Sequence, residues 1–141
     1  NLPEVSADIY GASEILINLI DNAIKYSNEG GLIEVGAQEN GDFVEVSVKD
    51  YGIGIPNGVL KNLFSKFYRS HRSRETVAGS GIGLYISKAI AENMGGKISV
   101  SSKEGKGSTF TVYFPIFDKI NNNSASPDTK NIVIKNHGKM L

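Results

Sequence analysis

The chain of 141 residues is long enough for one domain with a buried core, and its 15 basic and 15 acidic residues give no electrostatic reason to bind nucleic acid or an anionic membrane surface. The absence of cysteine excludes disulfides, thiolate metal sites and cysteine nucleophiles, and it fits a cytoplasmic location. No apolar run reaches the roughly 18 residues of a membrane span, and no signal peptide is evident. Because the chain starts abruptly and without Met, we expect it to be part of a longer protein.

The first predicted element is a helix over residues 8–27. Its apolar residues recur at helical spacing and predict a buried face: Ile15, Leu16, Leu19, Ile20 and Ala23. Three polar residues, Asn18, Asn22 and Lys25, step by four and then three positions and therefore share another face. The polar, glycine-containing residues 28–31 end the helix.

Two strands are predicted next, over residues 32–38 and 43–50, and the pair Asn40-Gly41 joins them into a hairpin. Residues 51–80 that follow are rich in Gly, Ser and Arg. Because loops of this length are uncommon inside compact domains, we expect this segment to be functional or disordered.

A second helix is predicted over residues 81–94, and Gly95-Gly96 ends it. Its predicted inward face consists of Ile82, Ile86, Ala89 and Ile90. A second hairpin pairs residues 97–102 with 108–114 around a turn at 104–107.

After Phe117 the composition shifts to NNNSASPDTKN, which cannot bury enough apolar surface to stay ordered by itself. We therefore predict a domain over residues 1–117 and a disordered polar tail or linker over 118–141. Residues 132–134 either begin another strand or belong to this tail. The fold class is predicted to be α+β, a two-layer sandwich with helices packed on one face of a mixed sheet.

The polar face of the first helix suits a metal and phosphate site. The carboxamide of Asn22 or Asn18 offers a hard oxygen to magnesium, and the ammonium of Lys25 can neutralise phosphate charge. The alternative is an ordinary solvated helix face. Tyr26, at the helix end, either stacks on a base or packs against the fold.

The sequence DYGIGIP, residues 50–56, comes directly after a strand. The carboxylate of Asp50 can accept a hydrogen bond from an exocyclic amine, which adenine has. Gly52 and Gly54 permit positive φ and would let a flat ligand lie against the backbone. The alternative is a turn that merely ends the strand.

The sequence GSGIGL, residues 79–84, opens the second helix, where exposed amides and the helix dipole favour an anion. It is not the dinucleotide fingerprint, because the spacing is GxGxG and no strand leads into it. No Gly-Lys pair is followed by Ser or Thr, which excludes a P-loop, and the triplet at His71 lacks the Asp of a eukaryotic-type kinase loop.

Between these two glycine motifs lies a short amphipathic piece at residues 59–68, followed by Arg69. Its aromatic residues Phe64, Phe67 and Tyr68 either anchor the long loop to the core or belong to a lid whose Arg69 reaches a terminal phosphate. Two histidines, His71 and His137, are interpreted as surface residues.

Five motifs in register resemble those of sensor histidine kinases, over residues 3–115. NLIDNAIKYS resembles the N box, DYGIGIP and GSGIGL the two glycine boxes, LFSKFYR the phenylalanine box, and GKGSTF the closing G-x-G-[ST]-x-F. The resemblance implies the catalytic and ATP-binding domain with the Bergerat fold, a long ATP lid, and ATP and Mg²⁺ as ligands. One departure is Met94, where many members have His.

The resemblance also implies a role for each matching residue. Asn22 would be the metal ligand with Asn18 beside it, and Lys25 and Arg69 would contact phosphate. Around the base, it implies Tyr26 flanking adenine, Asp50 bonding its amino group, Gly54 beneath it, and Thr109 as a water-linked contact. Gly79, Gly81 and Gly83 would form the phosphate-side hinge of the lid. The remaining implied contacts are Gly52, Ile55, Phe67, Tyr68, Ser80, Ile82 and Leu84.

Asn18 bears on the type of reaction. ATP hydrolases and serine kinases of the superfamily usually have a Glu there as general base, and Asn is a poor base. A neutral imidazole needs no base, so Asn18 favours phosphoryl transfer to histidine, with Asn18, Lys25 and Arg69 as catalytic residues. The alternatives are a self-contained ATPase or conformational switch, and a degenerate binding module.

The expected partners are a dimerisation domain that carries the phosphoacceptor histidine, absent from this sequence, and the receiver domain of a response regulator. The parent protein is expected to be a homodimer, with this domain on the cytoplasmic side if the parent is membrane-anchored. No nucleic acid and no direct membrane contact are expected. Without the phosphoacceptor, the chain is expected to bind ATP but not to autophosphorylate.

Overall fold

A computed structural model describes residues 1–27, 31–65, 83–123 and 133–134. In chain order the elements are β1 (Val5–Ser6), α1 (Ile9–Tyr26), β2 (Ile33–Asn40), β3 (Phe43–Asp50), α2 (Asn57–Leu60), α4 (Gly83–Asn93), β4 (Lys97–Lys103), β5 (Gly107–Pro115), α5 (Phe117–Asn123) and β6 (Val133–Ile134). None of the described helices is long and apolar enough to cross a membrane.

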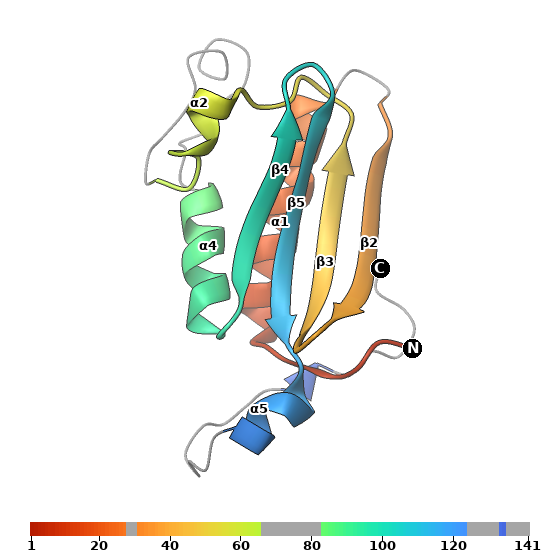
Figure 1. Cartoon of the computed structure of the whole chain (residues 1–141), viewed down its shortest axis with the longest axis vertical. Helices are drawn as coiled ribbons and strands as arrows, with labels where there is room; N and C mark the ends of the chain where they lie inside the picture. Colours follow the sequence, from red (N-terminus) through yellow and green to blue (C-terminus); the bar gives the residue numbers. More distant parts are fainter. Residues whose placement is uncertain (28–30, 66–82, 124–132, 135–141) are drawn as a thin grey trace.

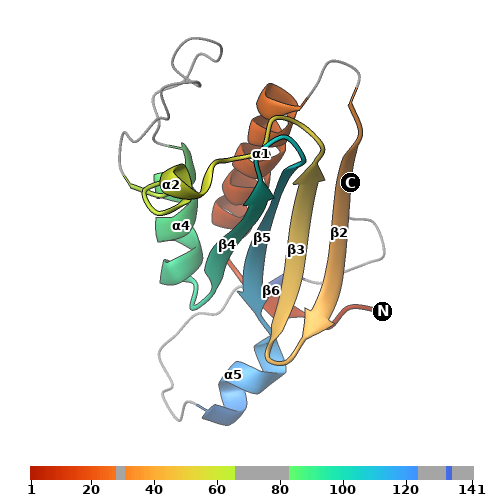
Figure 2. The ribbon, with the colours of Figure 1, turned by 45° about the horizontal axis from the view of Figure 1, so that its top comes forward.

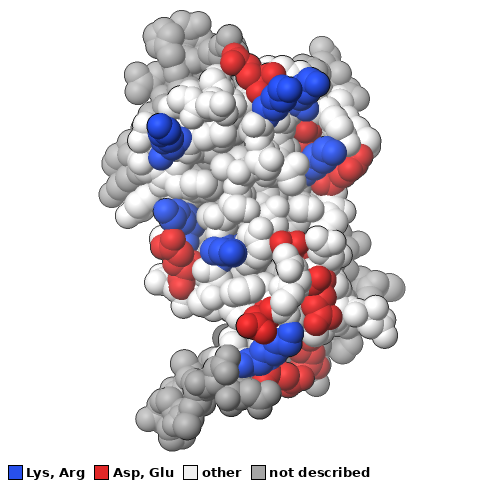
Figure 3. All heavy atoms as spheres, in the orientation of Figure 1, with Lys and Arg blue, Asp and Glu red and all other residues white. Residues whose placement is uncertain are grey.

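The main sheet has the strand order β2-β3-β5-β4 (Figure 1). Helices α1 and α4 lie on one of its faces, which confirms the predicted two-layer α+β fold (Figure 2). The prediction of a mixed sheet was wrong, because every neighbouring pair is antiparallel. Strands β3 and β4 run in the same direction, but they are not neighbours, because β5 lies between them and is antiparallel to both. The face turned away from the helices carries interspersed acidic and basic side chains (Figure 3).

The boundaries of α1 follow from its caps. The Asp8 carboxylate accepts hydrogen bonds from the amides of Tyr10 and Gly11, and the amide of Ser27 donates to the Ala23 carbonyl. Asp8 is thus an N-cap that satisfies amides left without a partner by the first turn. The prediction of a helix over residues 8–27 is confirmed to within one residue at each end.

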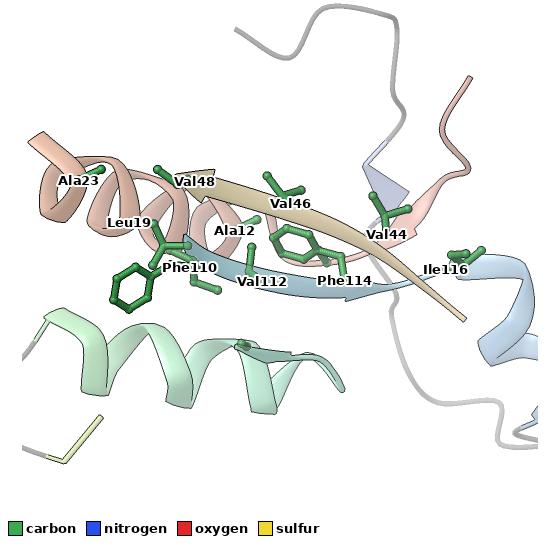
Figure 4. Packing of buried hydrophobic residues seen from close by; sticks show 13 residues of the cluster. Ala12, Leu19, Ala23, Val44, Val46, Val48, Phe110, Val112, Phe114 and Ile116 are labelled. Atoms are coloured by element: carbon green, nitrogen blue, oxygen red, sulfur yellow. The ribbon is translucent and has the colours of Figure 1, made fainter. Parts of the chain in front are cut away.

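The core lies between α1 and the central strands β3 and β5 (Figure 4). Ile15 and Leu19 of α1 are fully buried, as is Val112 of β5. Truncating such a residue to Ala costs about 2–5 kcal/mol. Along β3 and β5, buried apolar residues alternate with residues on the opposite face of the sheet. The buried residues are Val44, Val46, Val48, Phe110, Val112 and Phe114.

Helix α4 runs antiparallel to α1 and packs along it. A Cβ on Gly11 would lie 2.8 Å from Ile90, and the Asn18 side chain reaches Gly83 and Ser87. The buried residues of α4 are Ser87 and Ala91, with Leu84, Ile90 and Met94 packed on the core. The predicted inward face was therefore wrong for Ile86 and Ala89, which are half-buried outside this cluster, because the face of α4 that carries Ser87 and Ile90 packs against α1. Ile82 lies outside the described residues.

The first hairpin turn and the residues after β5 also bear on the sequence predictions. The first hairpin turns at Gly41-Asp42, one position later than predicted, because Asn40 pairs with Phe43. Beyond β5, the chain forms α5, and β6 pairs with β1. The strand alternative for residues 132–134 thus holds at Val133–Ile134, while the domain boundary at residue 117 stays a prediction.

Candidate functional site

The C-terminal ends of α1 and β3 and the turn between β4 and β5 meet at one end of the molecule (Figure 1, top). Strand β3 ends at Asp50, whose side chain is only 3% exposed. One of its oxygens accepts a hydrogen bond from the Gly52 amide at 3.0 Å. Its second oxygen accepts none from the described part of the chain, so it can accept one from a ligand.

Ser108 of β5 shares the face of the sheet on which Asp50 lies. The two residues are directly opposite in the β3–β5 register, and Ser108 is also buried. Thr109 is opposite Lys49, and successive side chains of a strand point to opposite faces. Ser108 therefore shares the face of Asp50 and Thr109 lies on the opposite face, while the adenine contact by Thr109 stays a prediction.

The turn after Asp50 is wedged between α1 and the β4–β5 turn. The amide of Ile53 donates to the Tyr26 carbonyl at 3.2 Å, and its own carbonyl accepts from the Gly105 amide at 2.7 Å. The first bond also satisfies one of the carbonyls that a helix end leaves unpaired. The base-side turn is thus joined to the last turn of α1.

Gly52 and Gly54 allow this close approach. A Cβ on Gly52 would lie 1.8 Å from the Tyr26 carbonyl oxygen, and one on Gly54 would lie 2.1 Å from that of Lys103. Gly54 has the predicted positive φ, +68°, but Gly52 does not. The prediction of a positive φ at Gly52 was therefore wrong, and at both glycines the space that a Cβ would need is taken by backbone.

A serine that the sequence did not single out fixes this turn. Ser102 of β4 accepts a hydrogen bond from the Ile55 amide at 2.8 Å and lies 2.7 Å from the Ser108 hydroxyl. It also donates to the Gly107 carbonyl at 3.0 Å. No local pattern could have identified it, since its partner in the turn is 47 residues away.

The predicted polar face of α1 divides into three different environments. Asn18 donates its side-chain amide to the Ser87 hydroxyl at 3.1 Å and to the Gly83 carbonyl at 3.3 Å. Asn22 is half-buried, and its side chain makes no hydrogen bond with the described residues. Lys25 forms an ion pair with Asp21 at 2.9 Å, with 37% of its side chain exposed.

The remaining predicted site residues fall into two groups. Ile55 and Leu84 pack on the core, and Phe64 meets Phe110 edge to face at 6.5 Å, so the start of the phenylalanine box anchors the loop. The others lie outside the described residues: Phe67, Tyr68, Arg69, Gly79, Ser80, Gly81 and Ile82.

Tyr51, beside Asp50, belongs to the open face of the sheet. Its hydroxyl donates to Glu34 at 2.9 Å, and the Lys49 ammonium lies 4.8 Å from its ring centre. Tyr51, with a smaller contribution from Glu34, raises the pKa of Lys49 above its ordinary value. Lys49 and Tyr51 thus interact on the face that Asp50 does not share.

Residues 7–118, more than half of the chain, match the family of histidine kinase-, DNA gyrase B- and HSP90-like ATPases. The chain belongs to this family. The relatives place it among its histidine kinases: the mycobacterial sensor histidine kinase MprB superposes with a TM-score of 0.69 at 30% identity, over 79% of this chain and 74% of that one. The chain is thus an ATP-binding catalytic domain of the sensor histidine kinase type.

Two further relatives show how much of a longer protein the match covers. The aerobic respiration control sensor protein ArcB of Escherichia coli strain K12 is 43% identical over 101 residues, which cover 70% of this chain and 13% of ArcB. Full-length ShkA in complex with AMPPNP superposes with a TM-score of 0.69 at 30% identity, over 82% of this chain and 24% of ShkA. The chain therefore spans a small part of the length of these two proteins.

Proposed function

We propose that this domain binds ATP with Mg²⁺ and transfers the γ-phosphoryl group to a histidine on a separate dimerisation domain, for relay to the receiver domain of a response regulator. The transfer would break the bond between the γ-phosphorus and its bridging oxygen, form a phosphorus–nitrogen bond, and leave ADP. The observation that carries the proposal is the junction at the end of α1, where the Ile53–Tyr26 hydrogen bond joins the Asp50 turn to the helix of Asn22. One ligand can thus have its base at Asp50 and its phosphates along α1.

At the base end, Asp50 offers one carboxylate oxygen that accepts no hydrogen bond from the described residues. Because Asp50 is almost completely buried, a hydrogen bond from an exocyclic amine to its carboxylate would be shielded from water. Such a bond is stronger in the protein interior than in water. Adenine carries that amine. The complex of ShkA with AMPPNP, an ATP analogue, supports the same ligand class.

At the phosphate end, Asn22 and Lys25 fit Mg²⁺ and an anion. The carboxamide oxygen of Asn22 is a hard ligand, and no described residue engages it. Lys25 would exchange the exposed carboxylate of Asp21 for a phosphate oxygen. Bound Mg²⁺ would neutralise the charge on the phosphate oxygens. Arg69, outside the described residues, stays the proposed contact to the γ-phosphate.

Asn18 supports transfer to histidine over hydrolysis. Its side-chain amide is engaged in hydrogen bonds to α4, and an amide cannot take a proton from water. A neutral imidazole attacks through its own lone pair and needs no such base. A self-contained ATPase or switch is therefore the less favoured function.

The test uses ATP with a radiolabelled γ-phosphate. We expect no label on the chain alone, and label on the dimerisation domain of the full-length protein when the two are mixed with Mg²⁺. The same domain with its phosphoacceptor histidine replaced is the control. Label on the isolated chain, or phosphate release that is equally fast without the added domain, would contradict the proposal.

A further inference from the structure

A buried polar contact links α1 to the start of α4. Ser87 is fully buried, and its hydroxyl accepts a hydrogen bond from the side-chain amide of Asn18 at 3.1 Å. The same amide donates to the carbonyl of Gly83, the first residue of α4, at 3.3 Å. Further along the pair of helices, contact is made by apolar packing of Ile90 on Gly11. The polar tie thus holds the end of α4 into which the second glycine box leads.

The bond to Gly83 requires a donor at position 18. A backbone carbonyl only accepts, and an ionised carboxylate cannot donate to it, whereas the Ser87 hydroxyl can accept from an amide or donate to a carboxylate. An Asp or Glu would put a charge against the Gly83 carbonyl in a half-buried position. The residue type at position 18 thus suits the joining of two helices.

Asn22 lies one helical turn beyond Asn18 on the same face of α1, about 6 Å along the axis. We propose that Asn18 and Ser87 are positioning residues, which set the start of α4 against Asn22 so that both can engage the phosphates of one ATP. Asn18 thereby acts through α4, and the catalytic role predicted for it from the sequence is replaced by a positioning role. This inference rests on the proposed function, since the tie affects ATP only if Asn22 serves its phosphates.

Displacing either element should weaken the end of the ligand that spans them. The γ-phosphate distinguishes ATP from ADP, whereas the base at Asp50 is common to both. Loss of one hydrogen bond between these helices is expected to lower the affinity for Mg²⁺-ATP about tenfold and that for ADP by less than about twofold. The ratio of the two affinities is therefore the readout, because a purely structural role would weaken both equally.

The experiment is calorimetric titration of the full chain with ATP and with ADP, in the presence of Mg²⁺. The variants are Asn18→Asp, which has the same shape but no amide donor, Ser87→Ala, and their combination; Ser13→Ala on the exposed side of α1 is the matched control. We expect both single variants to lower the ATP-to-ADP affinity ratio and the double variant to lower it further, because Asn18→Asp removes the bond to Gly83 and Ser87→Ala removes the bond to Ser87. Asn18 is half-buried, so Asn18→Asp keeps the test available if Ser87→Ala does not fold.

Two outcomes would overturn the inference. The first is an unchanged ATP-to-ADP affinity ratio in folded Asn18→Asp, which includes a parallel loss of ATP and ADP affinity. If Asn22→Ala lowers ATP affinity while Asn18→Asp leaves the ratio unchanged, the inference fails and the proposed function stands. The second is a wild-type chain that binds no ATP, which would overturn both the inference and the proposed function.

Discussion

The described glycines of the two glycine boxes, Gly52 and Gly54 in the first and Gly83 in the second, lie in different surroundings. In the first box, a side chain on Gly52 or Gly54 would run into backbone atoms about 2 Å away, because the turn is wedged between α1 and β4. In the second box, a Cβ on Gly83 would find its nearest neighbour, Asn18, at 3.8 Å, which is ordinary van der Waals contact. The fold itself demands glycine on the base side of the site and does not demand it at the start of α4.

This difference separates residues that build the site from residues that serve the ligand. A substitution in the first box should disturb stability and binding together, since one backbone approach supports both. A substitution at Gly83 should leave stability intact and show its effect with nucleotide. The comparison therefore predicts which variants separate the two properties.

The largest effect on stability is expected for Gly54→Ala. The new Cβ would meet the Lys103 carbonyl at 2.1 Å, and the backbone has φ +68°. Together the left-handed backbone and the overpacking should cost about 3 kcal/mol or more in the free energy of unfolding, measured with urea.

Two glycines provide graded controls for this variant. Gly105 has a positive φ, +80°, but open space, so Gly105→Ala should cost about 1–2 kcal/mol. Gly58 has open space and no positive φ, so Gly58→Ala should change stability by less than about 0.5 kcal/mol. A Gly54→Ala variant as stable as Gly58→Ala would contradict the close approach.

A smaller and opposite effect on stability is expected for Gly83→Ala. Alanine fits the space and favours a helix, so the free energy of unfolding should stay the same or rise by up to about 1 kcal/mol. We expect affinity for ATP to fall severalfold nonetheless, because the second glycine box is proposed to serve the phosphates. Urea unfolding and ATP titration of the same sample measure both. A loss of stability like that of Gly54→Ala would remove the distinction between the boxes.

Much of this architecture could be predicted from local patterns. Strand β3 was predicted at its observed bounds as half of a hairpin, and α1 was predicted from its apolar spacing. The places of Asp50 and Asn22 follow directly from these two elements. The motif order was enough to predict the family, because each motif is short and local.

The errors concern contacts between distant segments. The family resemblance implied an adenine contact by Thr109, but the face of a strand residue depends on its register with a neighbour, and it is Ser108 that lies opposite Asp50. Likewise, nothing near Ser87 indicates that Asn18 lies beside it, 69 positions away. The prediction of a mixed sheet was wrong because the order of the strands cannot be read from local patterns. In the assembled sheet β5 lies between β3 and β4, so these two parallel strands are not neighbours.

The most direct test of the central claim, an ATP site with its base at Asp50 and its metal at Asn22, is calorimetric titration of ATP with and without Mg²⁺. Removing Mg²⁺ should weaken binding by the wild-type chain about tenfold or more, and Asn22→Ala should bind equally weakly in both conditions. Asp50→Asn is the matched control. Its affinity for ATP should be lower than that of the wild type with and without Mg²⁺, and removing Mg²⁺ should lower it by the same factor as in the wild type. A dependence on Mg²⁺ that survives unchanged in Asn22→Ala would contradict the account.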